Sequence, residues 1–224
     1  MTKGKYLSDL YKSIENKSFN VDEAIKFIVD KKREKFDETI EISMNLGIDP
    51  RHADQMVRGV VSLPNGNGKV MKIAVFAKDK KAEEAKQAGA DVIGAEDLAE
   101  DMQKGNLDYD RVIATPDMMG VVGKIGKVLG PKGLMPNPKL GTVTPDVKAA
   151  VEAAKSGQVQ YRAEKTGIVQ AGIGKMSFGS DKLIENVNSF IEAIQKSRPS
   201  GAKGTFIKKI SISSTMGVGI NVNI

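Results

Sequence analysis

Strict alternation of apolar and polar residues near both ends of the chain is the pattern that most limits its fold. Residues 39–46 alternate along their whole length, and residues 218–224 repeat the pattern. The apolar positions of the first segment are Ile40, Ile42, Met44 and Leu46. Because successive side chains of a strand point to opposite faces, the alternation predicts antiparallel strands with one face packed and the other free.

Two segments with apolar residues at helical spacing complement these strands. Asn20 followed by Glu23 forms a capping box ahead of an apolar stripe in residues 21–29. Ser180 is placed to cap a second helix, whose apolar stripe runs through residues 183–194. Strands with helices over one face predict a split β-α-β sandwich.

The last third of the chain also contains a turn signal. Residues 158–162 and 167–171 resemble strands and flank the polar turn 163–166. Two strand-like runs joined by a short polar turn are typical of a β-hairpin, so we predict a hairpin at this place.

The middle of the chain has a different pattern. Short continuous apolar runs in residues 72–77, 91–94 and 111–115 each precede a helical segment. Continuous runs indicate strands buried on both faces, which is typical of a parallel sheet between helices. We therefore predict an α/β and α+β fold of two domains. Residues 1–66 plus 159–224 form a discontinuous domain, and residues 67–158 form an inserted three-layer α/β domain.

The net charge of +6 arises from 34 basic and 28 acidic residues and is uneven along the chain. Residues 159–224 hold nine basic and four acidic side chains, so their net charge is +5 (9 − 4). This excess predicts that an anionic partner binds there, although a merely solvated basic face would show the same excess.

The absence of cysteine excludes disulfides, a thiolate nucleophile and zinc sites built on sulfur. The start of the chain lacks the apolar core of a secretory signal, and no run of about 18 apolar residues is present. We expect a cytoplasmic protein with no membrane partner.

The chain is poor in residues that catalyse reactions. Its only histidine, His52, follows residues 49–51 in an expected turn, where an exposed position is a simpler interpretation than a catalytic one. Residues 120–127 resemble a phosphate-binding loop, but neither Gly-Lys pair has a glycine at the Walker distance or a hydroxyl after it. We therefore predict no enzyme, no catalytic residue, no cofactor and no metal. The alternative is an enzyme that binds a nucleotide in the α/β insert.

Residues 124–146 concentrate prolines and glycines. Because proline fixes φ and glycine widens it, this composition predicts an ordered loop, and Pro145 suits the first turn of a helix running towards Lys155. Four lysines spaced along such a surface suit contacts with the phosphates of an anionic partner. These are Lys124, Lys127, Lys132 and Lys139.

Within this loop, LGPKGLMPNPKLGTVTP closely resembles the signature of the bacterial branch of the large-subunit ribosomal protein L-one family. Further blocks resemble the family in the same order and cover essentially the whole chain. They are FNVDEAI, KFDETIEI, DPRHADQMVRG, IATPDMMGVVGK, GIVQAGIGKMSF, PSGAKGTFIKK and SSTMG.

The resemblance implies a fold and a function. The implied fold has a first domain made of both chain ends and a Rossmann-like domain inserted between them. The implied function is that of a structural constituent of the large ribosomal subunit, which binds large-subunit rRNA in the mobile side stalk beside the exit-site tRNA. Several members also bind a similar fold in their own mRNA and repress its translation. A free-standing translational repressor using the same surface is therefore a further alternative.

The resemblance also implies which residues bind RNA. They are Lys35, Phe36 and Thr39, then Glu164, Lys165 and Gly167, and finally Thr215, Met216 and Gly217. Threonine hydroxyls can bond a 2′-hydroxyl, glycine allows close approach of the backbone, and lysine neutralises phosphate. Phenylalanine and methionine can pack on ribose or base. A glutamate there would accept a hydrogen bond from a base amine or orient the neighbouring lysine.

Three positions depart from the usual family pattern. Gln170 replaces a frequent histidine, Val218 replaces a proline, and His52 stands where lysine is common. These departures affect the expected contacts near 167–171 and near the last strand.

Overall fold

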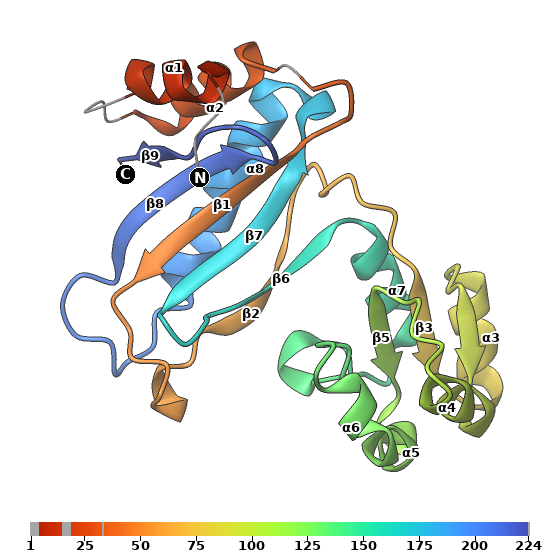
Figure 1. Ribbon diagram of the computed structural model, residues 1–224. Coiled ribbons are helices and arrows are strands. Elements are labelled where there is room, and N and C mark those ends of the chain that lie inside the picture. The colour runs from red at the N-terminus through yellow and green to blue at the C-terminus, as the bar shows by residue number, and fades with distance from the viewer. Residues whose placement is uncertain (1–4, 15–18, 33, 224) are drawn as a thin grey trace. The chain divides into compact units, whose positions relative to one another are not determined.

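The computed structural model describes residues 5–14, 19–32 and 34–223. The chain folds into two compact units (Figure 1). Unit 1 combines Met1–Gly68 with Val159–Ile224, and unit 2 is Lys69–Gln158. The predicted mixture of α-helices and several β-sheets is confirmed.

The described part of unit 1 contains a four-stranded antiparallel sheet of order β7-β1-β8-β9. Its strands are β1 (Thr39–Leu46), β7 (Ile168–Lys175), β8 (Ile207–Ser214) and β9 (Ile220–Val222). The main helices are α1 (Lys5–Ile14), α2 (Val21–Asp30) and α8 (Ser180–Lys196), with short turns η1 (Ala53–Gln55) and η4 (Met176–Phe178). Since β7 and β8 both run antiparallel to β1, they are parallel to each other, and α8 joins them in a split β-α-β arrangement.

The predicted alternation of β1 is confirmed. Ile40, Ile42, Met44 and Leu46 are at most 1% exposed and pack against α2 and α8. In Figure 1, α8 lies behind the sheet, so the opposite face of the sheet is turned towards the viewer. The sheet therefore has one packed face and one polar face. The final strand is confirmed over Ile220–Val222, and Ile224 lies outside the described residues.

The capping predictions have different outcomes. At α2, the Glu23 carboxylate accepts the backbone N–H of Asn20 at 3.4 Å, as the capping box requires. At α8, the predicted cap is wrong, because Ser180 is already the first helical residue and Gly179 precedes it. Gly179 has φ 82° and ψ 166°, a positive-φ conformation that glycine adopts far more readily than other residues.

The predicted hairpin is wrong. Strand β6 (Gln158–Arg162) pairs with β2 (Arg58–Ser62) in a separate two-stranded sheet, whereas β7 pairs with β1. Strands β6 and β7 are joined by a turn but do not pair with each other. In this turn, the N–H of Glu164 donates to the carbonyl of Ile168 at 2.9 Å. Alternating burial specifies which face of a strand is packed, but it does not specify the neighbouring strand.

Unit 2 contains a three-stranded parallel sheet of order β4-β3-β5, which confirms the prediction of parallel strands. Its strands are β3 (Ile73–Phe76), β4 (Val92–Gly94) and β5 (Arg111–Ala114). Its helices are α3 (Asp79–Gln87), α4 (Glu96–Gln103), α5 (Met119–Lys124), α6 (Gly126–Leu129) and α7 (Val147–Lys155), with short turns η2 (Pro116–Met118) and η3 (Pro138–Leu140). Strands β3 and β5 are buried at every position. One apolar cluster packs α3 and α7 on the sheet, and a second packs α4, α5 and α6.

The segment 124–146 is more helical than predicted. It contains the end of α5, all of α6 and the turn η3, so its surface is not irregular throughout. Pro145 does not occupy the first turn of α7. Asp146 caps that helix instead, because its carboxylate accepts the N–H of Ala149 at 3.1 Å.

The two ends of unit 2 are held by adjacent residues at the start of β5. Asp110 binds the side chain of Lys69 and the N–H of Lys72. Arg111 is 5% exposed and donates to the side chain and the carbonyl of Gln158, both at 2.8 Å. Burial lowers the pKa of Arg111 below its ordinary value. The first and last residues of unit 2 are thus both bonded to the start of β5.

Candidate nucleic-acid interface

Six of the residues expected to bind RNA belong to two segments that are bonded to each other at one end of the unit 1 sheet, and we call these six the turn cluster. They are Lys35, Phe36, Thr39, Thr215, Met216 and Gly217. The hydroxyl of Thr215 accepts the N–H of Thr39 at 3.0 Å and donates to its carbonyl at 3.3 Å. The N–H of Met216 donates to the buried carboxylate of Glu38 at 3.3 Å. The turn after β8 is therefore bonded directly to the start of β1.

The exposed part of the turn cluster includes two large apolar residues beside Lys35. Phe36 and Met216 are 49% and 57% exposed, so both present apolar surface to solvent. Such groups can pack on a ribose or an unstacked base. Gly217 packs closely on the end of β8, because a β-carbon there would lie 2.4 Å from the Ser214 hydroxyl and would force that side chain to move. The Thr215 hydroxyl already makes two hydrogen bonds to the backbone of Thr39, so only its second lone pair remains for the predicted contact with a 2′-hydroxyl.

The segment that carries Lys35 and Phe36 is fixed on its other side by β7 and η4. The Asp37 carboxylate accepts the N–H of Ser177 at 3.0 Å and its hydroxyl at 2.7 Å. The hydroxyl hydrogen bond from Ser177 is the main cause that lowers the pKa of Asp37 below its ordinary value. Lys175 donates to the Thr39 hydroxyl at 2.8 Å. None of these three contacts was predicted from the sequence.

Glu164, Lys165 and Gly167 lie at the opposite end of the sheet. The carbonyl of Gly167 accepts the N–H of Leu46, the last residue of β1. An eight-residue strand spans roughly 25 Å, so this group is not brought together with the turn cluster.

Gly167 has a structural role that differs from the predicted one. It is buried, with φ 78°, and a β-carbon there would lie 3.2 Å from the carbonyl oxygen of Leu46. The absence of a side chain at Gly167 lets the turn close against β1.

Glu164 and Lys165 line a cavity that we call the arginine pocket. Its volume is about 890 Å³. The lining residues are Pro50, Arg51, Met56, Arg162, Ala163, Glu164, Lys165 and Thr166. Three cations and one carboxylate surround an apolar side chain, Met56, that is 37% exposed. Cations beside an exposed apolar surface suit a phosphate with its attached base or sugar.

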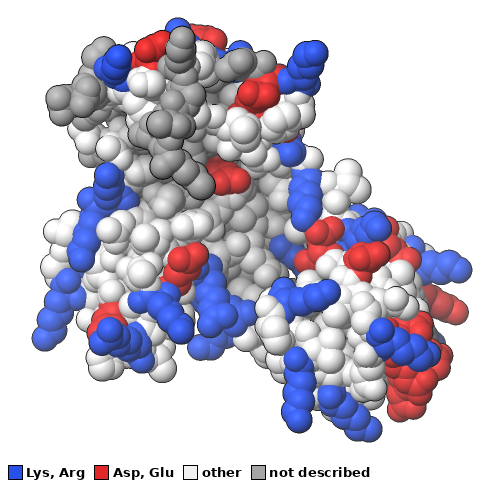
Figure 2. Space-filling model, viewed as in Figure 1, with Lys and Arg blue, Asp and Glu red and all other residues white. Residues whose placement is uncertain are grey.

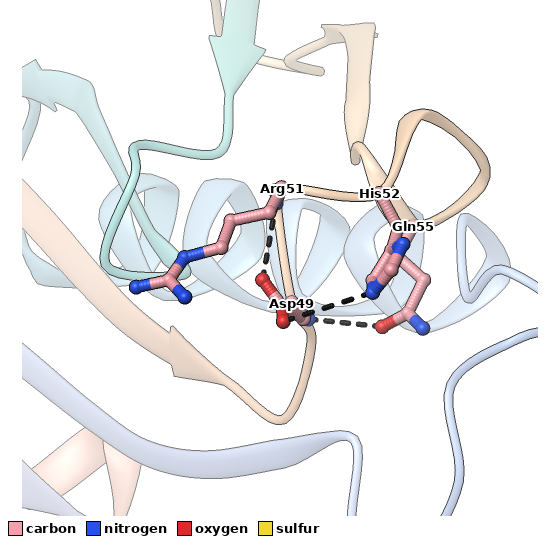
Figure 3. A network of polar contacts seen from close by, with 4 residues as sticks. All are labelled: Asp49, Arg51, His52 and Gln55. Atoms are coloured by element: carbon pink, nitrogen blue, oxygen red, sulfur yellow. Dashed lines mark hydrogen bonds and ion pairs between the residues drawn. The ribbon is translucent and has the colours of Figure 1, made fainter.

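Arg51, which lines this pocket, belongs to the turn before η1, and Figure 3 shows the polar contacts of that turn. The Asp49 carboxylate accepts the backbone N–H of Arg51 at 3.1 Å, and the side-chain oxygen of Gln55 accepts the N–H of Asp49 at 2.9 Å. The guanidinium of Arg51 extends away from Asp49 in Figure 3. His52 is exposed in this turn, as expected, with its ring 4.0 Å from the Asp49 carboxylate.

The polar face of the sheet connects the two ends. Ser43 of β1 pairs with Gln170 of β7 and Ser211 of β8, and Glu41 pairs with Gly172 and Ser213. A hollow of about 310 Å³ is lined by Glu41, Ile42, Ser43, Gln170, Ala171, Gly172 and Ser213. Gln170, which replaces the frequent histidine, is exposed on this face, whereas Val218 is buried. Of these two departures, Gln170 is therefore the one that changes the polar face.

The four lysines of segment 124–146 are all exposed on unit 2. They are Lys124, Lys127, Lys132 and Lys139. Figure 2 shows basic side chains over α5 and α6, and acidic side chains gathered over α3 and α4. In unit 1, the same view shows basic side chains gathered where β1 ends and β7 begins. On the face shown in Figure 2, the acidic side chains of unit 2 are therefore concentrated away from α5 and α6.

The sequence did not identify three lining residues of the arginine pocket, Arg51, Met56 and Arg162, as binding residues. No contiguous sequence signal joins residues 51 and 162. The polar face could be predicted, because the outward positions of 39–46 follow from the alternation.

In the described ranges, no group of three or more histidine, cysteine, aspartate or glutamate side chains is arranged to hold a metal ion. None of the helices in those ranges has the length and apolar composition of a membrane span.

A family model with the description "Ribosomal protein L1p/L10e family" matches residues 22–218. The match includes the turn cluster, the arginine pocket, the polar face and all of unit 2. The family consists of structural RNA-binding proteins of the large ribosomal subunit and not of enzymes. The chain therefore belongs to the ribosomal protein L1p/L10e family and has a structural, rRNA-binding role in the large ribosomal subunit.

Proposed function

We propose that unit 1 is the RNA-binding domain of a protein that builds the mobile side stalk of the large subunit, with unit 2 as an inserted Rossmann-like domain. The observation that carries this proposal is the polar sheet face, which has an exposed apolar and basic cluster at each end. Structured RNA offers sugar edges, 2′-hydroxyls and phosphates, and this surface offers hydroxyls, amides and cations.

We assign large-subunit rRNA to the turn cluster and the adjoining polar face. Phe36 and Met216 supply apolar contact, the serines of the polar face supply hydroxyls, and Lys35 neutralises phosphate. Glu41 is the one acidic side chain lining the hollow of this face, so it is expected to accept a hydrogen bond from RNA.

We assign the exit-site tRNA, whose movement and release the stalk assists, to the arginine pocket. The pocket lies at the other end of β1, so a second RNA can bind there while the turn cluster remains occupied. The lysines of segment 124–146 are proposed as secondary RNA contacts. Repression of the protein's own mRNA would use the turn cluster, since an mRNA that folds like the rRNA site would compete for the same surface.

Co-sedimentation with large subunits tests the main assignment. We expect the protein to sediment with the large subunit and to protect one segment of its rRNA from nuclease. Affinity for that segment should fall as salt rises, because phosphate contacts release counterions. A free-standing repressor would bind its mRNA but would not sediment with subunits. A well-folded protein that ignores the rRNA at low salt would rule out the proposed function.

Replacing Arg51 and Arg162 by alanine is expected to weaken tRNA binding and to leave rRNA affinity nearly unchanged. Each lost phosphate contact should reduce the slope of log K against log salt by about one. Titration of both RNAs at several salt concentrations measures this. Lys196→Ala is the control for charge, since Lys196 is exposed on α8, on the packed side of the sheet. Equal losses of affinity for tRNA and rRNA would reject the assignment of the two RNAs to separate sites.

A further inference from the structure

The segment before β1 presents Lys35 and Phe36 on a short loop, and three polar contacts hold that loop. Asp37 binds Ser177, Lys175 binds Thr39, and Thr215 binds the backbone of Thr39. Of these, the Asp37–Ser177 pair is nearest in sequence to Phe36. Its two hydrogen bonds, at 3.0 and 2.7 Å, join a loop residue to the turn η4 at the end of β7.

The bond geometry suits a positioning role. Both oxygens of Asp37 are engaged by one residue, which fixes the direction of the carboxylate as well as its distance. Lys175 also donates to the Asp37 carbonyl at 3.4 Å, and Lys32 contributes a weaker favourable charge. The Asp37 carboxylate therefore faces into the protein network, although the residue as a whole is exposed.

We propose that Asp37, acting through Ser177, is a positioning residue that pre-orders the Lys35–Phe36 loop for RNA. This inference rests on the proposed function of the turn cluster. A loop that is already ordered loses less conformational entropy when it binds, so affinity rises without any additional contact. Phe36 benefits most, because an aromatic ring stacks productively only in a narrow range of orientations.

Charge alone predicts the opposite effect of removing Asp37. A carboxylate near RNA is repelled by phosphates, so its removal should strengthen binding if it had no other role. Pre-ordering predicts that Asp37→Ala weakens binding of the protected rRNA segment, on the order of tenfold, which is the cost of ordering about one residue again. The sign of the change separates the two explanations.

Ser177→Ala distinguishes positioning from a direct contact between Asp37 and RNA. If Asp37 acts through Ser177, this variant also weakens binding, and the double variant is no weaker than Asp37→Ala alone. If Asp37 contacts RNA itself, Ser177→Ala leaves the affinity unchanged, and the inference is overturned. In a Phe36→Ala background, Asp37→Ala should have little further effect, because the loop then has no ring to orient.

The experiment uses the full chain and the rRNA segment that the wild-type protein protects from nuclease. Asp30→Ala, at the end of α2, is the matched control for the loss of one exposed carboxylate. Hydrogen exchange at residues 35–39 of the free protein should accelerate in Asp37→Ala and not in the control. If Asp37→Ala does not fold, Ser177→Ala alone decides the question. Failure of the wild-type protein to bind would reject the proposed function, whereas wild-type binding with unchanged or tighter binding by folded Asp37→Ala rejects only this inference.

Discussion

Thr215→Ala combined with Met216→Ala is expected to weaken rRNA binding, at about 1–3 kcal/mol for each specific contact that is lost. The substitution at Met216 removes an exposed apolar side chain. The substitution at Thr215 removes the two hydrogen bonds that join the turn after β8 to the start of β1. Because both side chains are exposed, the fold should survive with a loss of stability near 1 kcal/mol. Titration of the protected rRNA segment measures affinity, and circular dichroism checks the fold.

A conservative double variant is the matched control for this experiment. Thr215→Ser keeps the hydroxyl that bonds Thr39, and Met216→Leu keeps most of the apolar volume. We expect the affinity of this variant to stay close to wild type. If the folded alanine variant also binds like wild type, the turn cluster is not the rRNA site. The two residues are neighbours, so their separate effects need not add.

The parts of the fold predicted correctly are those that hydrophobic periodicity encodes. The alternation of β1 and the continuous runs of β3 and β5 each state how many faces of a strand are buried. Burial on one face predicted an antiparallel strand, and burial on both faces predicted parallel strands between helices. The structure has both, with one face of β1 buried and both faces of β3 and β5 buried.

The parts predicted wrongly depend on which elements are neighbours in space. Strand β6 has the pattern of a hairpin strand, but β2 offers it a better partner. The ring of Tyr161 in β6 lies over Gly59 in β2, where a β-carbon would be 2.5 Å from the tyrosine oxygen, and it packs edge-on against Phe190. This tertiary packing decides the pairing, and a local pattern contains no information about it.

The candidate site was likewise predicted in part, because the sequence indicated its segments but not which of them are neighbours in space. The resemblance predicted the blocks that contain the turn cluster, and the structure places two of those blocks in contact through Thr39 and Thr215. It places the third block at the other end of β1, beside Arg51 and Arg162. Since the sequence orders residues along the chain and not along a sheet, a single predicted surface became two clusters joined by a polar face.

Asn186 is a further residue that the sequence did not single out, and replacing it is expected to have the largest effect on stability. It lies on α8 among apolar residues and is 0% exposed. Its side-chain nitrogen donates to the carbonyls of Gly66 and Ile173, both at 2.9 Å, and its oxygen accepts the N–H of Asn65 at 3.1 Å. One side chain thus anchors the segment that leaves unit 1 to both α8 and β7.

Asn186→Leu should lower the free energy of unfolding of unit 1 by about 3–5 kcal/mol. Leucine has a similar volume, so the loss comes from one N–H and two carbonyls whose bonds disappear, at about 1–3 kcal/mol for each group that stays buried. Urea unfolding followed by circular dichroism measures the change. Asn188→Leu is the matched control, because Asn188 is exposed on the same helix and its replacement should change stability by no more than about 0.5 kcal/mol. Equal, small effects of the two variants would mean that water replaces the Asn186 bonds and that the segment is anchored by packing alone.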